Sequence, residues 1–416
     1  MQKQNLQTLK GFRDFLPDQK RARDLAMAKI KSTFELYGFE PLETPTLEYS
    51  ELLLGKYGDE ADKLVYSFED RGGRKVALRY DQTVPTARVL SQYQNELGKN
   101  FRRYQIQPVF RADKPQKGRY REFTQCDADI FGTNSAVADA EILAVYYNIY
   151  KNLGISDLVI ELNDRQTLIK TLTPFATELV NVSSIIQSID KLDKQSKDEV
   201  VSELVSKGLE EPVAKNVLAA IDSASASINL AAIMDIATEL GIPSKNLKFN
   251  AALARGLDYY TGMIFEGKVP GESGSVGGGG RYDNLIESLG GPSIPAVGFG
   301  LGFDRTIEVL MSRDLVSTKP QTKVLVTIFS SDTQSDLSDI SFKTATQLRQ
   351  AGINTELYPS PNDKFGKQLK YAIKKGIPYI ISTKDNNDLM GKVILTKTST
   401  GEETSLSIDD SIAILR

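Results

Sequence analysis

Residues 110–130, with the sequence FRADKPQKGRYREFTQCDADI, carry side chains suited to phosphate chemistry. Strand patterns over 104–110 and 121–131 flank a polar loop from Ala112 to Gly118, which predicts a long hairpin. The hairpin holds two acids, Asp113 and Glu122, and five cations: Arg111, Lys114, Lys117, Arg119 and Arg121. Because the planar guanidinium binds phosphate oxygens in pairs, this segment predicts a polyphosphate or nucleic-acid contact. A solvated charged hairpin explains the same pattern equally well.

Residues 297–310 (VGFGLGFDRTIEVL) alternate glycine with apolar residues. On a strand, Gly298, Gly300 and Gly302 share one face and leave it bare, so a nucleotide base could lie there. Arg305 follows at the start of a helix, where its charge can meet phosphate. Close packing of a glycine-containing strand against a helix is the alternative. The segment does not match GxGxxG, and no GxxxxGK[ST] loop occurs in the chain, which excludes P-loop chemistry.

Two further segments combine arginine with tyrosine. Residues 253–266 (LARGLDYYTGMIFE) place Arg255 close to Asp258, Tyr259 and Tyr260, an arrangement that favours a bound anion. Residues 275–286 (SVGGGGRYDNLI) place four glycines before an Arg-Tyr-Asp triplet and an amphipathic helix, which predicts backbone that approaches a ligand. A surface edge strand and a flexible linker are the respective alternatives.

A basic helix is predicted over residues 364–375 (KFGKQLKYAIKK). Four lysines recur at three- and four-residue steps, and apolar residues are expected on the opposite face. The lysines are Lys364, Lys367, Lys370 and Lys374, and the apolar residues are Phe365, Leu369 and Ile373. Such a stripe fits a contact with a phosphate backbone, or else a solvated helix face.

Composition narrows the chemistry. Histidine and tryptophan are absent, and Cys126 is the single cysteine of the 416 residues. The chain therefore lacks the commonest general base and the commonest zinc ligand, and it cannot form an internal disulfide. A net charge of −3 does not suggest a non-specific binder of polyanions. No uninterrupted apolar run of membrane length and no secretory leader are evident, so a cytoplasmic protein without zinc is expected.

Periodicity predicts the elements that must position these segments. A helix over 18–37 is expected to bury Leu25, Ala28 and Phe34 and to end at Gly38. A second helix is predicted over 136–153, followed by a strand over 158–162. From about 166 to 244 the pattern is helical, strands resume near Phe249, and residues 314–321 form a linker. Beyond it, strands and helices alternate, which indicates a small α/β domain.

Together these segments resemble the class II aminoacyl-tRNA synthetases, and specifically the histidyl-tRNA synthetase family. The segment YGFEPLETPTLE with Pro45 resembles motif 1 at the dimer interface, residues 110–130 resemble motif 2, and residues 298–305 resemble motif 3. The segments ARGLDYYTG and GGGRYDNL are similar to the histidine-specific motifs of the family, and LRYDQTVPTAR, residues 78–88, is also typical of it. The C-terminal hundred residues, with LMGKV and TGEET, resemble its anticodon-binding domain.

The fold class that this resemblance implies is α+β. The family's antiparallel-sheet catalytic core would occupy residues 1–165, with motifs 1 and 2, and residues 245–318, with the histidine motifs and motif 3. Residues 166–244 would form a helical insertion. Residues 322–416 would form a C-terminal α/β anticodon-binding domain.

The resemblance also assigns roles to single residues. Arg111 and Arg305 would hold the ATP phosphates, with Arg119 supporting them, Asp113 in the ATP site and Phe123 stacked on adenine. Asp81, Thr83 and Gln125 would bind the α-ammonium group of histidine. Asp129 and Tyr260 would bind its imidazole, and Tyr282 would close that pocket. Arg255, with Arg111 and Arg305, would be catalytic. Gln116 and Lys117 would face the tRNA acceptor end, and Lys367 and Lys370 would contact the anticodon stem.

The implied reaction is activation of L-histidine with ATP and Mg²⁺, followed by transfer to the 3′ end of tRNA(His) by a homodimer. Two alternatives share the same core without the activity: a regulatory subunit of ATP phosphoribosyltransferase and a sensor of uncharged tRNA. The complete ARGLDYY segment and the additional C-terminal domain disfavour the regulatory subunit. The arginines in both ATP motifs disfavour the sensor. Thr124, where many histidyl enzymes carry histidine, is a departure from the family pattern.

Overall fold

The computed structural model describes most of the chain and divides it into two compact units. The first unit is Met1–Asp14 and Arg23–Val316, and the second is Phe15–Ala22 and Ser317–Arg416. The described residues are 6–54, 64–115, 118, 120–254, 259–328, 336–382 and 392–416.

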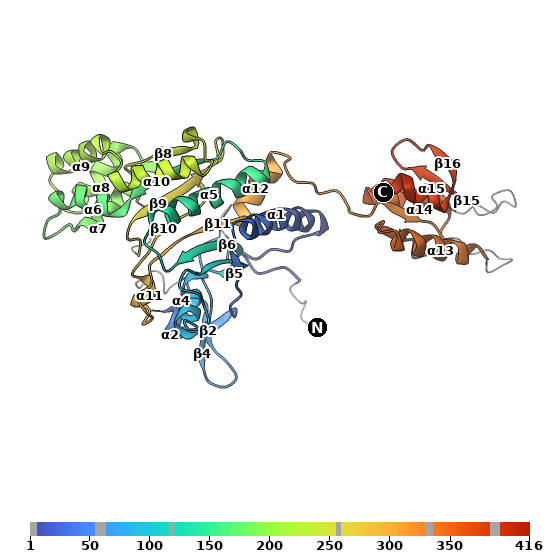
Figure 1. Ribbon diagram of the computed structural model, residues 1–416, viewed down its shortest axis with the longest axis horizontal. Helices are drawn as coiled ribbons and strands as arrows, with labels where there is room; N and C mark the ends of the chain where they lie inside the picture. Colours follow the sequence, from blue (N-terminus) through green and yellow to red (C-terminus); the bar gives the residue numbers. More distant parts are fainter. Residues whose placement is uncertain are drawn as a thin grey trace. The chain divides into compact units, whose positions relative to one another are not determined.

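An eight-stranded sheet forms the centre of the first unit (Figure 1). The inner pairs of strands are antiparallel, whereas the outermost pair at each edge is parallel. This sheet confirms the predicted α+β antiparallel core. In spatial order its strands are β1 (Glu40–Pro41), β5 (Arg102–Phe110), β6 (Glu122–Phe131), β11 (Ala296–Gly302), β10 (Ser275–Arg281), β9 (Met263–Lys268), β7 (Val159–Asp164) and β8 (Leu247–Phe249).

Helices cover one face of this sheet (Figure 1). They are α1 (Pro17–Leu36), α5 (Ala136–Leu153), α10 (Ile228–Glu239) and α12 (Phe303–Ser312), and their buried residues join one hydrophobic core with the strands. Helix α5 has the predicted bounds because its ends are capped. The Ser135 side chain accepts a hydrogen bond from the Val137 N–H, and Gly154 adopts the left-handed φ of 95°.

Helix α1 is present and Phe34 is buried as predicted, but the prediction was wrong for Leu25 and Ala28. Ala22, Ala26, Ile30 and Phe34 recur every four residues and are fully buried, whereas Leu25 is 41% exposed and Ala28 is exposed. Ala26, Ile30 and Phe34 belong to the hydrophobic core that the helix shares with the sheet, and a small residue such as Ala26 lets the helix approach the sheet closely.

The other side of the sheet carries α4 (Thr83–Gln92) and α11 (Leu285–Ser288) (Figure 1). Residues of both helices join Tyr260 and Tyr282 in a second hydrophobic cluster. A three-stranded sheet lies next to α4, in the order β2 (Leu47–Tyr49), β4 (Lys75–Leu78) and β3 (Ser67–Glu69), with α2 (Ser50–Leu53) against it.

Between β7 and β8 the described chain is helical. Four helices share a hydrophobic cluster of their own, whereas α10 packs against α5. The predicted insertion limits, 166 and 244, stay predictions. The four helices are α6 (Arg165–Leu172), α7 (Val182–Ile189), α8 (Lys197–Ser206) and α9 (Glu211–Ser223), and the short helical turns are η1 (Thr173–Phe175), η2 (Asp190–Asp193) and η3 (Ser244–Asn246).

The stretch Glu211–Glu239 is long and apolar enough by composition to cross a membrane. In the structure it forms two separate helices, α9 with 13 residues and α10 with 12. Each is shorter than the about 20 residues that a spanning helix needs. Val217 and Ile221 of α9 and Leu230 of α10 are buried in hydrophobic clusters. We therefore interpret the stretch as two core helices.

The second unit contains a five-stranded mixed sheet, which confirms the predicted small α/β domain. Its strand order is β13 (Thr355–Leu357), β12 (Val324–Val326), β14 (Tyr379–Ser382), β15 (Lys392–Lys397) and β16 (Glu403–Ser407), and its helices are α13 (Asp336–Gln350), α14 (Phe365–Lys375) and α15 (Ile408–Leu415). On α14 the buried positions are Gln368 and Ala372, whereas Ile373 is 53% exposed. Of the three apolar residues expected opposite the lysines, Phe365 and Leu369 pack against the core of this unit, whereas Ile373 does not.

The glycine run 277–280 is an interior strand rather than a linker, because β10 pairs with both β9 and β11. A Cβ on Gly279 would lie 2.0 Å from the carbonyl oxygen of Gly298. We expect Gly279→Ala to lower the free energy of unfolding by about 1–3 kcal/mol or more, as overpacking does. Gly98→Ala is the matched control, since nothing lies within 4 Å of its added Cβ. Urea unfolding measures both variants, and equal stability of the two would contradict this packing.

Candidate active site

The face of the sheet opposite α5 is polar because three neighbouring strands are in register. Gln125, Asp127 and Asp129 alternate along β6, so they share one face. On the β11 side their partners are Gly302, Gly300 and Gly298, and on the β5 side they are Gln107, Gln105 and Arg103. The three β11 glycines leave room for the β6 side chains. A Cβ at Gly298, for example, would lie 1.8 Å from the Asp129 carboxylate.

A cleft of about 390 Å³ opens beside the carboxyl-terminal end of β11. Its size suits a nucleotide. Four of the five residues predicted to bind ATP line it, namely Arg111, Asp113, Phe123 and Arg305, together with Gln125, Glu266 and the glycines Gly277, Gly300 and Gly302. The fifth, Arg119, lies outside the described residues.

Both described arginines of the cleft keep their charge available. The Nε of Arg111 donates to the Tyr80 carbonyl at 3.0 Å, and its guanidinium lies 5.2 Å from the centre of the Phe123 ring. Arg305, in the first turn of α12, donates to the Ser275 carbonyl at 2.7 Å. Within the described residues no carboxylate forms an ion pair with either arginine. An anion such as a polyphosphate can therefore bind between them.

A second group of side chains, the carboxyl-rich compartment, lies on the same sheet face as Gln125 of the cleft and includes Asp81, Asp127 and Asp129. Arg103 is fully buried and pairs with Asp129 at 2.5 Å, and the Tyr282 hydroxyl donates a hydrogen bond to the same carboxylate. Burial raises the pKa of Asp129 against the pull of Arg103. Burial also raises the pKa of Asp81 to about 6, although the Val84 N–H and Arg111 act in the opposite direction. The compartment is thus short of positive charge and suits a cationic ligand.

Tyr260 and Tyr282 form the apolar wall of this compartment. Both are more than nine-tenths buried. The ring of Tyr259 lies 4.6 Å from that of Tyr260 and 5.8 Å from that of Tyr282, centre to centre. Arg281 fixes the Tyr282 backbone from the far side through its ion pair with Asp139 at 2.6 Å. Strand β9, which follows Tyr260 in the chain, pairs with both β10 and β7. The described residues 259–266 therefore do not form the surface edge strand that was the alternative for residues 253–266.

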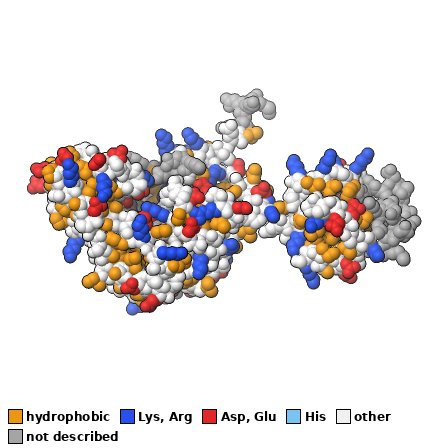
Figure 2. Space-filling model, turned by 90° about the horizontal axis from the view of Figure 1, so that it is seen from above, with side chains coloured by type: hydrophobic (Ala, Val, Ile, Leu, Met, Phe, Trp, Pro, Cys, Tyr) orange, Lys and Arg blue, Asp and Glu red, His pale blue; other side chains and the backbone are white. Residues whose placement is uncertain are grey.

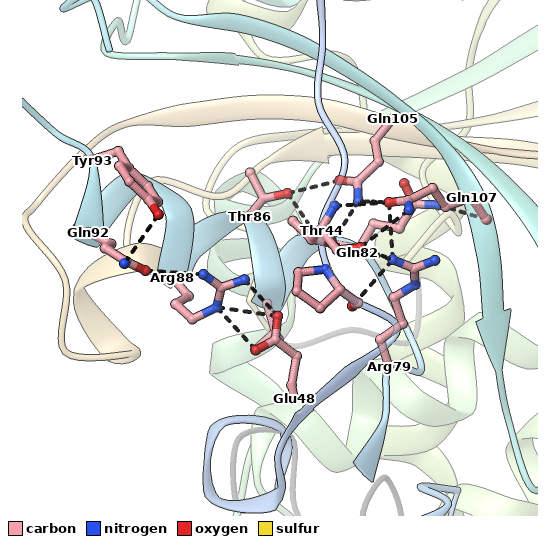
Figure 3. Close-up of polar contacts among 12 residues, drawn as sticks. Thr44, Glu48, Arg79, Gln82, Thr86, Arg88, Gln92, Tyr93, Gln105 and Gln107 are labelled. Carbon is pink, nitrogen blue, oxygen red and sulfur yellow. Dashed lines mark hydrogen bonds and ion pairs between the residues drawn. The ribbon is translucent and has the colours of Figure 1, made fainter. Parts of the chain in front are cut away.

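A buried polar network positions the loop that carries Asp81 and Thr83 (Figure 3). Arg79, fully buried, donates to the carbonyl oxygens of Thr44 at 2.7 Å and of Pro108 at 2.8 Å, and to the Gln107 side chain at 3.0 Å. The Gln82 side chain donates to the backbone carbonyls of Gln107 and Gln125. The loop is thus held on both sides of Asp81 against β5 and β6.

A second anchor fixes motif 3. The Asp304 carboxylate forms ion pairs with Arg13 and Arg23, both at 2.6 Å, and accepts a hydrogen bond from the Thr124 N–H at 3.0 Å. It thereby ties the start of α12, where Arg305 stands, to the second strand of the hairpin.

The structure brings Gln125 together with the ATP residues Arg111, Asp113, Phe123 and Arg305 in the cleft. Tyr260 and Tyr282 share a hydrophobic cluster, and Tyr282 donates to Asp129. Arg255, Gln116 and Lys117 lie outside the described residues. Lys367 forms an ion pair with Asp363 at 2.7 Å, whereas Lys370 is exposed and has no ion-pair partner among the described residues. Sequence reasoning missed Arg103, Asp127, Arg79 and Asp304. The period-two polar pattern shared by residues 103–107 and 125–129 was the available signal for the first two.

An antiparallel core with its nucleotide cleft on the open face is the architecture of the class II aminoacyl-tRNA synthetases. The family model described as histidyl-tRNA synthetase matches residues 11–306, and a model described as anticodon binding domain matches residues 323–416. The chain therefore belongs to the histidyl-tRNA synthetase family.

Individual relatives agree with this assignment. A histidine–tRNA ligase of Rhodopirellula baltica is 39% identical over 96% of this chain and 95% of its own length. One of Cytophaga hutchinsonii is 36% identical over 97% of this chain and 98% of its own length. The crystal structure of a histidyl-tRNA synthetase from a Nostoc species is 29% identical, covers 99% of this chain and 100% of that one, and superposes with a TM-score of 0.84.

The buried pair of Arg103 and Asp129 is testable by stability. We expect Arg103→Met to cost about 3–5 kcal/mol at pH 8, because it leaves buried carboxyls without their cation. The loss should shrink toward acidic pH, where those carboxyls take up protons. Arg102→Met is the matched control, since Arg102 pairs with Glu141 near the surface and should cost less than about 1 kcal/mol. Urea unfolding at both pH values decides, and equal losses for the two arginines would contradict the assigned role.

Proposed function

We propose that this chain activates L-histidine with ATP to histidyl-adenylate and transfers the histidyl group to the 3′ end of tRNA(His). The observation that carries the proposal is the charge pattern on one sheet face. Arg111 and Arg305 face the cleft and form no ion pair with a carboxylate in the part of the chain that the structure describes, and the half-buried Asp81 and the buried Asp129 lie in the carboxyl-rich compartment. An amino acid with a second basic group fits the carboxyl-rich compartment, and a nucleoside triphosphate fits the cleft lined by the arginines.

For the amino acid, Asp81, Thr83 and Gln125 would bind the α-ammonium group. Asp129 would accept a hydrogen bond from the imidazole, and Tyr260 would contact the ring. Tyr282, by donating to Asp129, would leave that carboxylate oriented toward the ligand. Carboxylates suit both tasks, since hydrogen bonds between charged partners are stronger than neutral ones.

The chemistry needs no protein base. The substrate carboxylate is already an anion when it attacks the α-phosphorus of ATP, and pyrophosphate leaves with the bonding electron pair. Arg255, by resemblance, would bridge the attacking carboxylate and the α-phosphate, with Arg111 and Arg305 on the phosphates. The ribose hydroxyl of the tRNA then attacks the carbonyl carbon and releases AMP. Catalysis is therefore positioning and charge stabilisation, which a chain without histidine can supply.

Mg²⁺ would enter with ATP. Asp113 and Glu266 line the cleft, but the described residues contain no group of three or more potential metal ligands among Asp, Glu and Cys. A site built this way suits an ion held mostly by phosphates and water, with one or two carboxylates. The bound ion would neutralise phosphate charge.

A homodimer is the assembly we propose, across the three-stranded sheet. Leu47, Tyr49 and Phe68 on its two outer strands are 44%, 56% and 49% exposed. Large apolar side chains gathered on one small sheet indicate a protein contact. Thr44 and Pro45, just before β2, accept hydrogen bonds from Arg79, so the same contact would support the Asp81 loop.

We place the reaction in the cytoplasm.

The second unit would bind the tRNA anticodon stem, with α14 among its contacts. Figure 2 shows charges of both signs over both units, with Lys and Arg side chains projecting from several sides of the second, including its upper edge in this view. Lys370 and Lys374 of α14 are exposed and form no ion pair within the described residues. Lys367 offers less net charge because Asp363 neutralises it.

Amino-acid-dependent exchange between ATP and pyrophosphate tests the activation step. We expect exchange with histidine alone among the twenty amino acids. Arg255→Ala should lower the rate of adenylate formation at least about 10²-fold, because it removes a fixed donor to charge that grows in the transition state. A single-turnover rate within about threefold of the parent would remove Arg255 from catalysis. Exchange with none of the twenty would favour a regulatory subunit or a sensor of uncharged tRNA.

Salt-dependent tRNA binding tests α14. Lys370→Ala should weaken binding and reduce the slope of log affinity against log salt by about one, since one fewer counterion is released. Lys367→Ala should have a smaller effect, because Asp363 already pairs with it. Lys375→Ala is the control, as this residue pairs with Glu356 at 2.6 Å. An unchanged slope for Lys370→Ala would exclude this helix from the interface.

A further inference from the structure

Asp127 is a buried carboxyl group that has no role in the histidine and ATP contacts described above. It is 5% exposed, and its Oδ1 has no hydrogen-bond partner in the described structure. It lies on β6 between Gln125 and Asp129, on the ligand side of the sheet. A buried acid without a partner is costly, so its presence at a ligand face calls for a ligand group that satisfies it.

The position of Oδ1 relates Asp127 to the reacting end of the pocket. A Cβ added to Gly300 would lie 3.0 Å from this oxygen, so Oδ1 lies over the glycine. Gly300 and Gln125 both line the nucleotide cleft, whereas Asp129 pairs with Arg103 and Tyr282 on the side away from it. Asp127 therefore stands between the cleft and the carboxyl-rich compartment, where the α-carbon of the amino acid must lie.

Four charged groups face Asp127 from the surrounding elements: Asp81 from the loop before α4, Arg103 from β5, Arg111 from the hairpin and Asp129 from β6. On the β11 side it faces only glycine. Arg103 is already paired with Asp129, and Arg111 faces the cleft. Burial, together with the two neighbouring acids, raises the pKa of Asp127 to about 8. Three acids thus share two arginines, and the set lacks one positive charge.

We propose that Asp127 is a third carboxyl of the amino-acid pocket and accepts a hydrogen bond from the substrate's α-ammonium group. Its raised pKa means that this carboxyl carries a proton in the empty site near neutral pH. The incoming cation supplies the missing charge, so Asp127 releases its proton to solvent as the amino acid binds. The proposal rests on the proposed function, because it takes the compartment to be the histidine pocket. Asp127 would then contribute to selection of a free α-ammonium group, next to Gln125.

Because Asp127 releases a proton when histidine binds, the affinity for histidine should depend on pH. Binding favours the ionised carboxyl, so affinity for histidine should rise as pH rises through the pKa of the empty site, and level off above it. Ionisation of histidine itself is common to parent and variant, so the ratio of their affinities isolates Asp127. In Asp127→Asn the ratio should reach about ten- to hundredfold at pH 8.5, the usual worth of a hydrogen bond to a charged group, and fall to within about threefold at pH 6.

Calorimetric titration of the full-length chain with L-histidine alone tests the proposal, in buffers of different ionisation enthalpy. At pH 7 the parent should release close to one proton more per histidine bound than Asp127→Asn does. Glu161→Gln is the matched control: Glu161 is a buried carboxyl on β7 that pairs with Lys268, and its replacement should leave proton release unchanged. Thermal unfolding of ligand-free Asp127→Asn distinguishes a structural role of Asp127 from a role in binding. If Asp127 only binds the ligand, the variant should be as stable as the parent.

The outcomes are distinguishable. Equal proton release and equal pH dependence in parent and Asp127→Asn would overturn the proposal, as would tighter binding by the variant at every pH. If Asp127→Asn fails to fold, Asp127→Ser serves in its place with the same expected loss of proton release. If the parent binds no histidine, the proposed function fails, and this is a separate result from a parent that binds histidine independently of Asp127.

Discussion

The buried ion pair between Arg103 and Asp129 is the interaction on which the ligand face depends. A carboxylate in this position would otherwise be protonated or expelled, because burial penalises its charge. The arginine is held on β5 directly opposite the acid on β6, and the neighbour of the acid on β11 is a glycine. A larger residue at Gly298 would collide with the carboxylate. Register, charge and side-chain size at three adjacent strands therefore have to agree before the pocket can exist.

Buried polar contacts also position the loop that carries Asp81, outside the sheet. The Asp81 loop has no regular structure of its own, so its position depends on Arg79 and Gln82, whose side chains bond to backbone carbonyls of β5, β6 and the segment before β2. Arg79 has no carboxylate partner among the described residues, and burial lowers its pKa. The cost of burying Arg79 is offset by five oxygen acceptors from two segments, residues 44–45 and 107–108, so the residue fixes the geometry of these segments rather than adding net stability.

Local patterns predicted the elements well, because caps and periodicity are local properties. The bounds of α5 and its end at Gly154 follow from Ser135 and a left-handed glycine. The buried face of α1 and the exposure of Ile373 were mispredicted, since both depend on which neighbour packs against the helix. In the site, resemblance supplied the cleft residues, whereas Arg103 and Asp127 were missed. Their polar alternation is visible in each strand alone, but only the pairing of β5 with β6 shows that it forms one surface.

The ligand face of the sheet carries arginines on one side and carboxyl groups on the other, and this separation of charge can orient a bound ligand. At the hairpin and at α12, arginines that pair with no carboxylate among the described residues face the cleft, and carboxyls gather a few residues away on β6 and before α4. A zwitterion placed between them is oriented by its own charges, with its ammonium toward the acids and its carboxylate toward the arginines and the phosphates. If the chain acts as proposed, this orientation carries the nucleophile to the α-phosphorus without a catalytic base. A regulatory protein with the same fold has no need to keep the arginines of a nucleotide cleft beside a group of acids with raised pKa values, so their presence in this chain favours the enzyme.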